Sequence, residues 1–138
     1  MIVVDTSVWV SFLRDERSPV RSTLERLLDD DAVLLPRLVK VELLAGAGGH
    51  SLPVLHRTLS ALQTLTPSAD TWALIEHWVT RAAARGLRFG VGDLLVAACA
   101  AERGALLWSL DHDFDPMVKQ RWIRRFVPLA VPRPTPRR

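Results

Sequence analysis

The chain has 138 residues, 49% of them hydrophobic, and a formal net charge of +3 at pH 7. This length suits one domain with a single core, and the hydrophobic content excludes a disordered chain. No apolar run approaches the roughly 18 residues of a membrane span, and the start MIVVDTSVW lacks the basic segment of a signal peptide.

Cysteine content and charge distribution indicate the location of the protein and the kinds of partner that it can bind. The single cysteine, Cys99, lies in the apolar run LLVAACAA and cannot form an internal disulfide, so we expect a core residue and a reducing, cytoplasmic location. Three of the arginines, Arg133, Arg137 and Arg138, lie in the last six residues, and without them 15 basic residues face 15 acidic ones. Charge alone therefore argues only weakly for a nucleic-acid partner.

The N-terminal half alternates short apolar segments with helical patterns. Residues 2–4 (IVV) predict a buried strand, and residues 5–7 (DTS) suit a turn or helix cap before a brief helix. Ser18 and Pro19 predict the N-cap and first residue of a second helix, which ends at the acidic residues 29–31. There follow a predicted strand at 32–36, a helix at 37–46 and an amphipathic helix at 52–62.

The C-terminal half continues the alternation. We expect an edge strand at 64–67, a long helix from Ser68 to about Arg85, an apolar helix from 92 to 103, and strands at 105–110 and 124–129. This order predicts an α/β fold with a parallel sheet of four to five strands and helices on both faces. We interpret residues 1–130 as one domain and residues 131–138 (VPRPTPRR) as a flexible Pro/Arg-rich tail.

Four acidic residues fall where such a fold gathers its ligands, beyond the carboxyl ends of the strands. Asp5 follows the first strand, Asp111 follows the fourth, Asp93 opens a helix, and Glu42 lies in the second turn of another. Helical spacing places Glu42 among apolar neighbours, where an ionised carboxylate is costly without a partner. We therefore expect the four carboxylates to converge on one rim of the sheet.

Carboxylates that converge need a cation or bound protons to offset their mutual repulsion. Two of them ~4 Å apart repel by about 4 kcal/mol at an effective dielectric near 20. No cluster of histidine or cysteine suits zinc, whereas an all-oxygen site suits Mg²⁺, or alternatively Mn²⁺. Such an ion can activate water and stabilise the leaving oxygen of a phosphodiester.

Each acid also has an ordinary structural interpretation. Asp5 and Asp93 can act only as helix caps, Asp111 and Asp113 as turn residues, and Glu42 can pair with Arg37 or Arg88. Two groups of arginines and one histidine can contact phosphates or simply face solvent: Arg81, Arg85, Arg88, Arg121, Arg124, Arg125 and His112. Trp72 and Trp78 cannot both face inward from one helix, so one is a candidate for a partner surface.

Four segments in this order resemble a PIN-domain ribonuclease, specifically the VapC-type toxin of a type II toxin–antitoxin pair. They are VDTSVWVSFL (4–13), VELLAG (41–46), GDLLVAACA (92–100) and WSLDHDF (108–114), and together they cover nearly the whole chain. The resemblance implies a PIN-like three-layer fold with the sheet order 3-2-1-4-5. It also implies Mg²⁺-dependent endonucleolytic cleavage of structured RNA such as tRNA or rRNA, with 5′-phosphate and 3′-hydroxyl products.

Residue by residue, the resemblance places the metal-binding and catalytic acids at Asp5, Glu42, Asp93 and Asp111, with Asp113 as an additional member. Ser109 occupies the position of a supporting Thr or Ser, and Thr6 or Ser7 can support Asp5 in the same way. A VapB-type antitoxin and a homodimer are the implied partners, and the RNA-binding residues stay open.

Two rival functions stay open as well. One is a non-catalytic module on the same fold that binds nucleic acid or protein. The other is a phosphoacceptor domain with an aspartate nucleophile, which would need a lysine at the pocket; Lys40 and Lys119, the only two lysines, suit this poorly.

Overall fold

The computed structural model describes residues 1–129, so the expected tail at 131–138 lies outside the described residues. Its strands are β1 (Ile2–Val4), β2 (Val33–Pro36), β3 (Gln63–Leu65), β4 (Leu106–Trp108) and β5 (Arg124–Arg125). Its helices are α1 (Thr6–Arg14), α2 (Arg21–Asp29), α3 (Arg37–Gly46), α4 (Leu52–Ser60), α5 (Ala69–Ala84), α6 (Val91–Glu102), the 3₁₀ helix η1 (His112–Phe114) and α7 (Asp115–Lys119).

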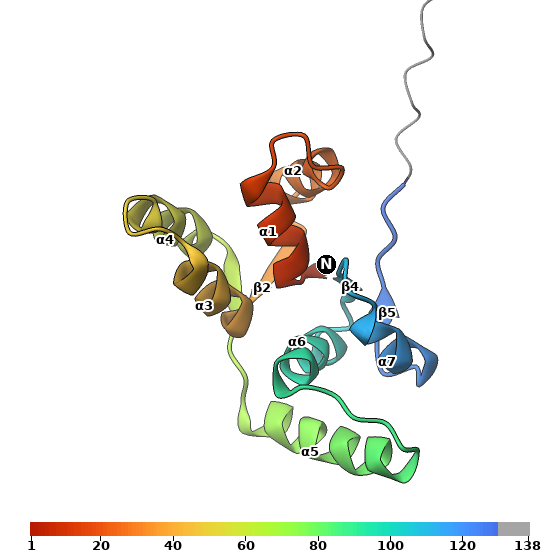
Figure 1. Ribbon diagram of the computed structural model, residues 1–138. Coiled ribbons are helices and arrows are strands. Elements are labelled where there is room, and N and C mark those ends of the chain that lie inside the picture. Colours follow the sequence, from red (N-terminus) through yellow and green to blue (C-terminus); the bar gives the residue numbers. More distant parts are fainter. Residues whose placement is uncertain (130–138) are drawn as a thin grey trace, which may run out of the picture.

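The five strands form one sheet in the order β3-β2-β1-β4-β5, and every neighbouring pair is parallel. Figure 1 shows α1 and α2 on one side of the strands and α5 and α6 on the other. The three-layer α/β fold and the order 3-2-1-4-5 are therefore confirmed. Strands β1 and β4 lie side by side at the centre, with Val4 paired to Trp108, so the loops that follow them share one edge.

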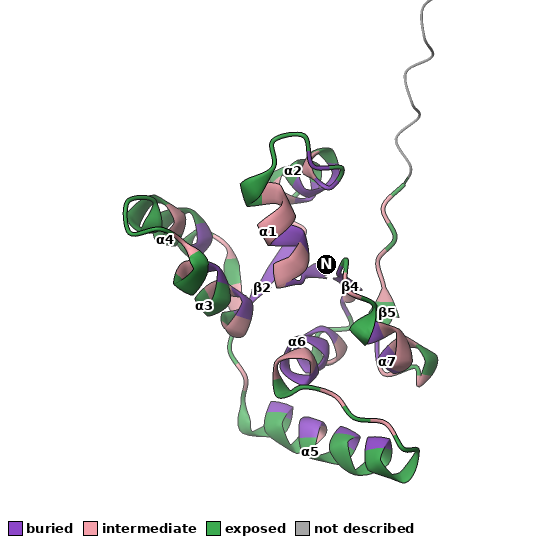
Figure 2. Ribbon diagram, viewed as in Figure 1, coloured by how far each residue is buried: buried purple, intermediate pink, exposed green. Residues whose placement is uncertain are grey.

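The core centres on α6, whose residues Leu94 to Ala100 are all buried. A helix that is apolar all round must be covered on all sides, and α6 contacts β1, β4, α3 and α5. Cys99 is buried as expected, and burial raises the pKa of its thiol to about 11. Figure 2 shows the burial pattern of the outer helix α5, which is buried on its inner side and exposed on its outer side.

The long helix α5 confirms the expectation for its two tryptophans. Trp78 is 5% exposed and stacks on Trp122, with ring centroids 5.0 Å apart, whereas Trp72 is 46% exposed. None of the helices within residues 1–129 combines the length and apolar character needed to cross a membrane.

Several boundaries differ from the prediction by one or two residues, and the end of the fifth strand differs by four. The second helix begins at Arg21 rather than Pro19, because the Ser18 hydroxyl lies 2.6 Å from that of Ser11 and accepts the Val20 amide within a turn instead of capping a helix. The fifth strand spans only Arg124–Arg125, and its ladder ends where the Phe126 amide donates to the Leu107 carbonyl.

The segment between β4 and β5 contains two short helices, η1 and α7, that the sequence patterns did not predict. Each is shorter than the windows in which helical periodicity becomes visible. Buried Phe114 and Met117 anchor this segment to the core. It forms part of the edge at which the acidic residues were expected to meet.

Candidate functional site

Asp5 lies at the junction of β1 and α1, next to the central strand β4. Its amide donates to the Trp108 carbonyl at 2.9 Å, which fixes the backbone, and the side chain is buried with 8% exposure. The carboxylate caps α1 through the Ser7 amide, at 3.5 Å, so the ordinary capping role is real. Capping engages Oδ2 only, and Oδ1 accepts no hydrogen bond from the described residues.

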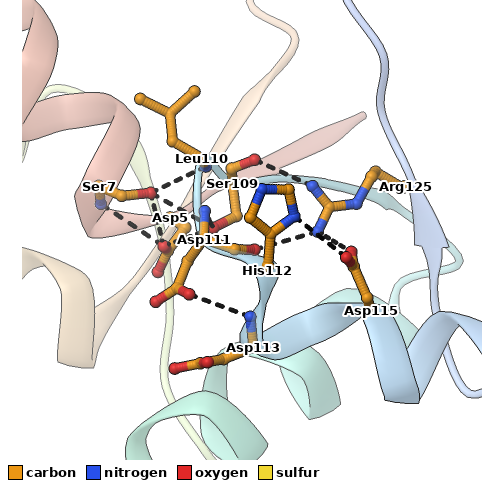
Figure 3. A network of polar contacts seen from close by, with 9 residues as sticks. All are labelled: Asp5, Ser7, Ser109, Leu110, Asp111, His112, Asp113, Asp115 and Arg125. Carbon is orange, nitrogen blue, oxygen red and sulfur yellow. Dashed lines mark hydrogen bonds and ion pairs between the residues drawn. The ribbon is translucent and has the colours of Figure 1, made fainter.

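Two serine hydroxyls hold the same oxygen of Asp5 (Figure 3). Ser7 Oγ donates to Oδ2 at 2.9 Å, and Ser109 Oγ, from the end of β4, donates at 2.8 Å. Ser7 Oγ also accepts the Leu110 amide at 3.0 Å, which ties α1 to the loop after β4. Thr6 does not share this role, because its buried Oγ1 has no hydrogen-bond partner in the described part of the chain.

The loop after β4 places two further acids beside Asp5. The Asp111 amide donates to Ser109 Oγ at 2.9 Å, and the Asp113 amide donates to Asp111 Oδ1 at 3.0 Å. Asp111 is therefore the N-cap of η1, and Asp113 lies in its first turn. Local hydrogen bonds account for the turn without neutralising either carboxylate.

Asp93 and Glu42 reach the edge from helices on the two sides of the sheet. Asp93 lies in the first turn of α6, is partly buried and makes no capping hydrogen bond. Glu42 lies in the second turn of α3, beside apolar side chains of a groove, but it is exposed, so the expected cost of burying its carboxylate does not arise. Helical spacing sets the direction of a side chain but not what covers it, and Ala45 on the same side is exposed too.

The charges of the other four acids act on Asp93. Partial burial, followed by the negative charges of Asp5, Asp111, Asp113 and Glu42, raises the pKa of the Asp93 carboxyl to about 6. The ion pairs within residues 1–129 join other groups: Arg21 to Glu25, and both His112 and Arg125 to Asp115. The five acids are thus drawn from remote segments to one edge and lack a cationic partner among the described residues, so the alternative in which Glu42 pairs with Arg37 or Arg88 does not occur there.

The donor set suits a hard divalent cation, since it consists of carboxylates supported by hydroxyls. In the part of the chain that the structure describes, however, no three acidic, histidine or cysteine side chains lie close enough together to hold a metal ion as they stand. Like charges repel, so carboxylates that share an edge separate until a cation lies between them. We infer that Asp5, Asp93 and Asp111, with Glu42 and Asp113 further out, would hold Mg²⁺ or Mn²⁺ after small side-chain rotations.

Sequence reasoning missed one element of this edge. Arg125, considered only for phosphate contacts, donates to the carbonyls of Ser109 and Asp111 and pairs with Asp115, whose Oδ2 lies 3.1 Å from His112 Nδ1 (Figure 3). No short-range pattern links residues ten or more positions apart. Only the pairing of Arg125 with Leu107 of β4 could have indicated that Arg125 reaches this loop.

The lysine that a phosphoacceptor site would need is directed elsewhere. Lys40 Nζ donates to Ser60 Oγ at 3.1 Å, on the exterior of α3 and α4. Lys119 is exposed at the end of α7. This arrangement disfavours the phosphoacceptor alternative.

Comparisons with known proteins agree with this geometry. The sequence matches the PIN domain family over residues 2–119. Ribonuclease VapC11 of Mycobacterium tuberculosis and VapC ribonuclease Mb1587 of Mycobacterium bovis are each 30% identical over 123 residues, 83% of this chain and 90% of the relative.

Among solved structures, the VapBC2 complex of Rickettsia felis, bound to a DNA fragment from its promoter, has a TM-score of 0.76 at 22% identity, over 91% of this chain and 98% of that one. FitAcB from Neisseria gonorrhoeae has a TM-score of 0.73 at 25% identity, over 92% and 97%. Fold, acidic edge and sequence relatives agree, and the chain belongs to the PIN-domain family, among the VapC-type ribonucleases.

Proposed function

We propose that this protein is a Mg²⁺-dependent endoribonuclease toxin that hydrolyses phosphodiester bonds in structured RNA, such as tRNA or rRNA. One observation carries the proposal: carboxylates from four separate segments share the carboxyl edge of β1 and β4 and lack a cationic partner in the described chain. An arrangement that served folding alone would pair or neutralise them. The site residues named from the sequence are therefore proposed as the catalytic set.

We assign each acid a role in binding the ion or orienting water according to its position. Asp5 is fixed by the Ser7 and Ser109 hydroxyls on Oδ2, which leaves Oδ1 to bind the ion. Asp93 and Asp111 flank it and would complete the inner ligands, and Glu42 and Asp113 would orient water. A bound Mg²⁺ supplies charge stabilisation to the phosphate and lowers the pKa of water. Attack of a water oxygen on phosphorus would break the P–O3′ bond, with the water proton passing to solvent and O3′ taking one up, so that the products would carry 5′-phosphate and 3′-hydroxyl ends.

A protein partner is part of the proposal. The structures similar to this chain include VapBC toxin–antitoxin complexes, and we propose a VapB-type antitoxin, a homodimer and a cytoplasmic location for this protein. A groove of about 660 Å³ between α1, α3 and α4 supports a bound partner. Its lining includes Glu42 and the exposed apolar side chains of Leu13 and Val54.

The test is cleavage of total RNA, a tRNA transcript and a sarcin–ricin-loop hairpin by purified protein in Mg²⁺, in Mn²⁺ and in EDTA. We expect cutting with either ion, none in EDTA, and a loss of at least about 100-fold in Asp5→Asn and Asp93→Asn, because metal and phosphate stabilisation are lost together. Asp70→Asn is a matched control, since Asp70 also lies in the first turn of a helix but is exposed and is not among the charges that raise the pKa of Asp93.

Equal cutting in all conditions, or undiminished cutting by Asp93→Asn, would refute a metal-dependent mechanism. RNA binding without cutting under any condition would instead favour the non-catalytic binding module. The ends of the products show which P–O bond is broken. Ligation of a labelled oligonucleotide to the downstream fragment requires a 5′-phosphate, so successful labelling indicates cleavage of the P–O3′ bond.

A further inference from the structure

The guanidinium of Arg125 contacts the backbone on both sides of Asp111. Nη1 donates to the Ser109 carbonyl at 3.2 Å, and Nη2 donates to the Asp111 carbonyl at 3.1 Å and to Asp115 Oδ1 at 2.7 Å. Figure 3 shows the arginine facing the loop after β4 from the neighbouring strand. One rigid, always charged fork therefore spans the loop that bears Asp111 and Asp113.

The position of Arg125 is set by the sheet. Its residue pairs with Leu107 of β4, and the Phe126 amide donates to the Leu107 carbonyl at 2.8 Å. The side chain is only 26% exposed. Because β5 is anchored to β4, the guanidinium links the loop to the sheet at a point that the loop's own hydrogen bonds do not reach.

Asp115 is the counter-ion of Arg125, and this pairing keeps the guanidinium from forming an ion pair with the carboxylates of the acidic edge. A guanidinium so close to Asp111 could pair with a site carboxylate and occupy the place of a cation. Its ion pair is made with Asp115 instead, and its other contacts are to carbonyl oxygens. The loop is thereby held by a cation while Asp111 and Asp113 keep their charges.

We propose that Arg125, with Asp115 as its counter-ion, is a positioning residue that holds the Ser109–Asp115 loop in the geometry needed for divalent-ion binding. The proposal rests on the proposed function for its link to catalysis. It also makes a claim about the metal-free protein: the loop is ordered by Arg125 before any ion binds. That claim can be tested without activity.

The neighbouring arginine provides a matched control. Arg124 lies in the same two-residue strand, but its Nη2 donates to the Gly104 carbonyl, at 3.0 Å, near the start of β4. Successive strand residues point to opposite sides, so Arg124 and Arg125 lie on one strand but contact different parts of the chain. Arg124→Met therefore removes an arginine and a carbonyl contact without touching the loop.

The experiment compares Arg125→Met, Arg124→Met and the unaltered protein. In EDTA, hydrogen–deuterium exchange of the segment 109–115 should accelerate about tenfold in Arg125→Met, as expected for losing a charge-assisted hydrogen bond, and stay unchanged in Arg124→Met. By calorimetry, the dissociation constant for Mn²⁺ should rise by about 10-fold or more. The Mn²⁺ concentration for half-maximal RNA cleavage should rise in parallel.

Unchanged exchange and unchanged Mn²⁺ affinity in Arg125→Met would overturn the proposal, as would equal effects of the two substitutions. If Arg125→Met does not fold, Arg125→Lys replaces it: lysine keeps the charge but cannot span both carbonyls, so faster exchange is again expected and unchanged exchange again refutes. If the unaltered protein neither binds Mn²⁺ nor cleaves RNA, the proposed function fails, while the exchange comparison still decides whether Arg125 holds the loop.

Discussion

Replacing Asp93 with asparagine should stabilise the metal-free protein, although it should abolish catalysis. Burial and four neighbouring carboxylates raise the pKa of Asp93 from 3.8 to about 6. The folded state therefore binds the Asp93 proton more tightly than the unfolded state does. The resulting loss of stability is absent below pH 3.8, grows as the pH rises towards 6, and is constant above that.

The magnitude follows from the size of the pKa change. A rise from 3.8 to about 6 corresponds to about 3 kcal/mol between the two protonation states. Asp93 is only partly buried, and solvent screening reduces the expected effect to about 1–2 kcal/mol. For a domain of this size, Asp93→Asn should then raise the melting temperature in EDTA at pH 7.5 by about 3–8 °C.

The assay is thermal unfolding followed by circular dichroism, in EDTA, from pH 4.5 to 8. The advantage of Asp93→Asn should shrink as the pH falls below 6, and Asp70→Asn, in the first turn of α5, should show no such trend. Added Mn²⁺ should reverse the order, because only the unaltered protein gains binding energy from the ion. An equal or lower melting temperature for Asp93→Asn at pH 7.5 in EDTA would refute a repulsive acidic edge.

Three further outcomes follow from the same network. Ser109→Ala should lower the free energy of unfolding by about 1–3 kcal/mol in urea titrations, because two buried hydrogen bonds are lost, and Ser109→Thr should restore it. Thr6→Val should leave RNA cleavage unchanged and stability equal or higher, since Thr6 Oγ1 is buried without a partner among residues 1–129, whereas Ser7→Ala should impair both. Mn²⁺ at about 100 times its dissociation constant should stabilise the unaltered protein by about 2.7 kcal/mol, and Asp5→Asn should lose most of this gain.

Much of the fold could be predicted from the chain because its signals are local. The run IVV before Asp5 and the apolar stretch after Asp93 fix a strand and a buried helix by composition alone. The sheet order came from resemblance, since no local pattern states which strands pair. The fifth strand was predicted too long because an apolar run such as 126–129 signals packing on the core, as Phe126 shows, but not how far the ladder with β4 continues.

The acidic edge was predictable in outline for a different reason. Asp5, Asp93 and Asp111 sit at strand or helix ends, Glu42 lies one turn further into its helix, and parallel topology gathers such ends at one edge. The surroundings of Glu42 were not predictable, because exposure depends on which elements cover a helix face. Nor was the role of Ser7 over Thr6: adjacent hydroxyls have the same chemistry, and only the backbone of α1 decides which one meets Asp5.

The distribution of ion pairs links stability to the proposed chemistry. Arg125, the arginine in contact with the loop of Asp111, is matched by Asp115. Asp93 is left to face the neighbouring carboxylates, which raise its pKa, and we expect this repulsion to lower the stability of the metal-free protein. A bound divalent ion would relieve this repulsion, and the relief would contribute to the binding free energy of the ion. An arginine pairing directly with Asp93 or Asp111 would stabilise the fold and weaken the site by the same interaction.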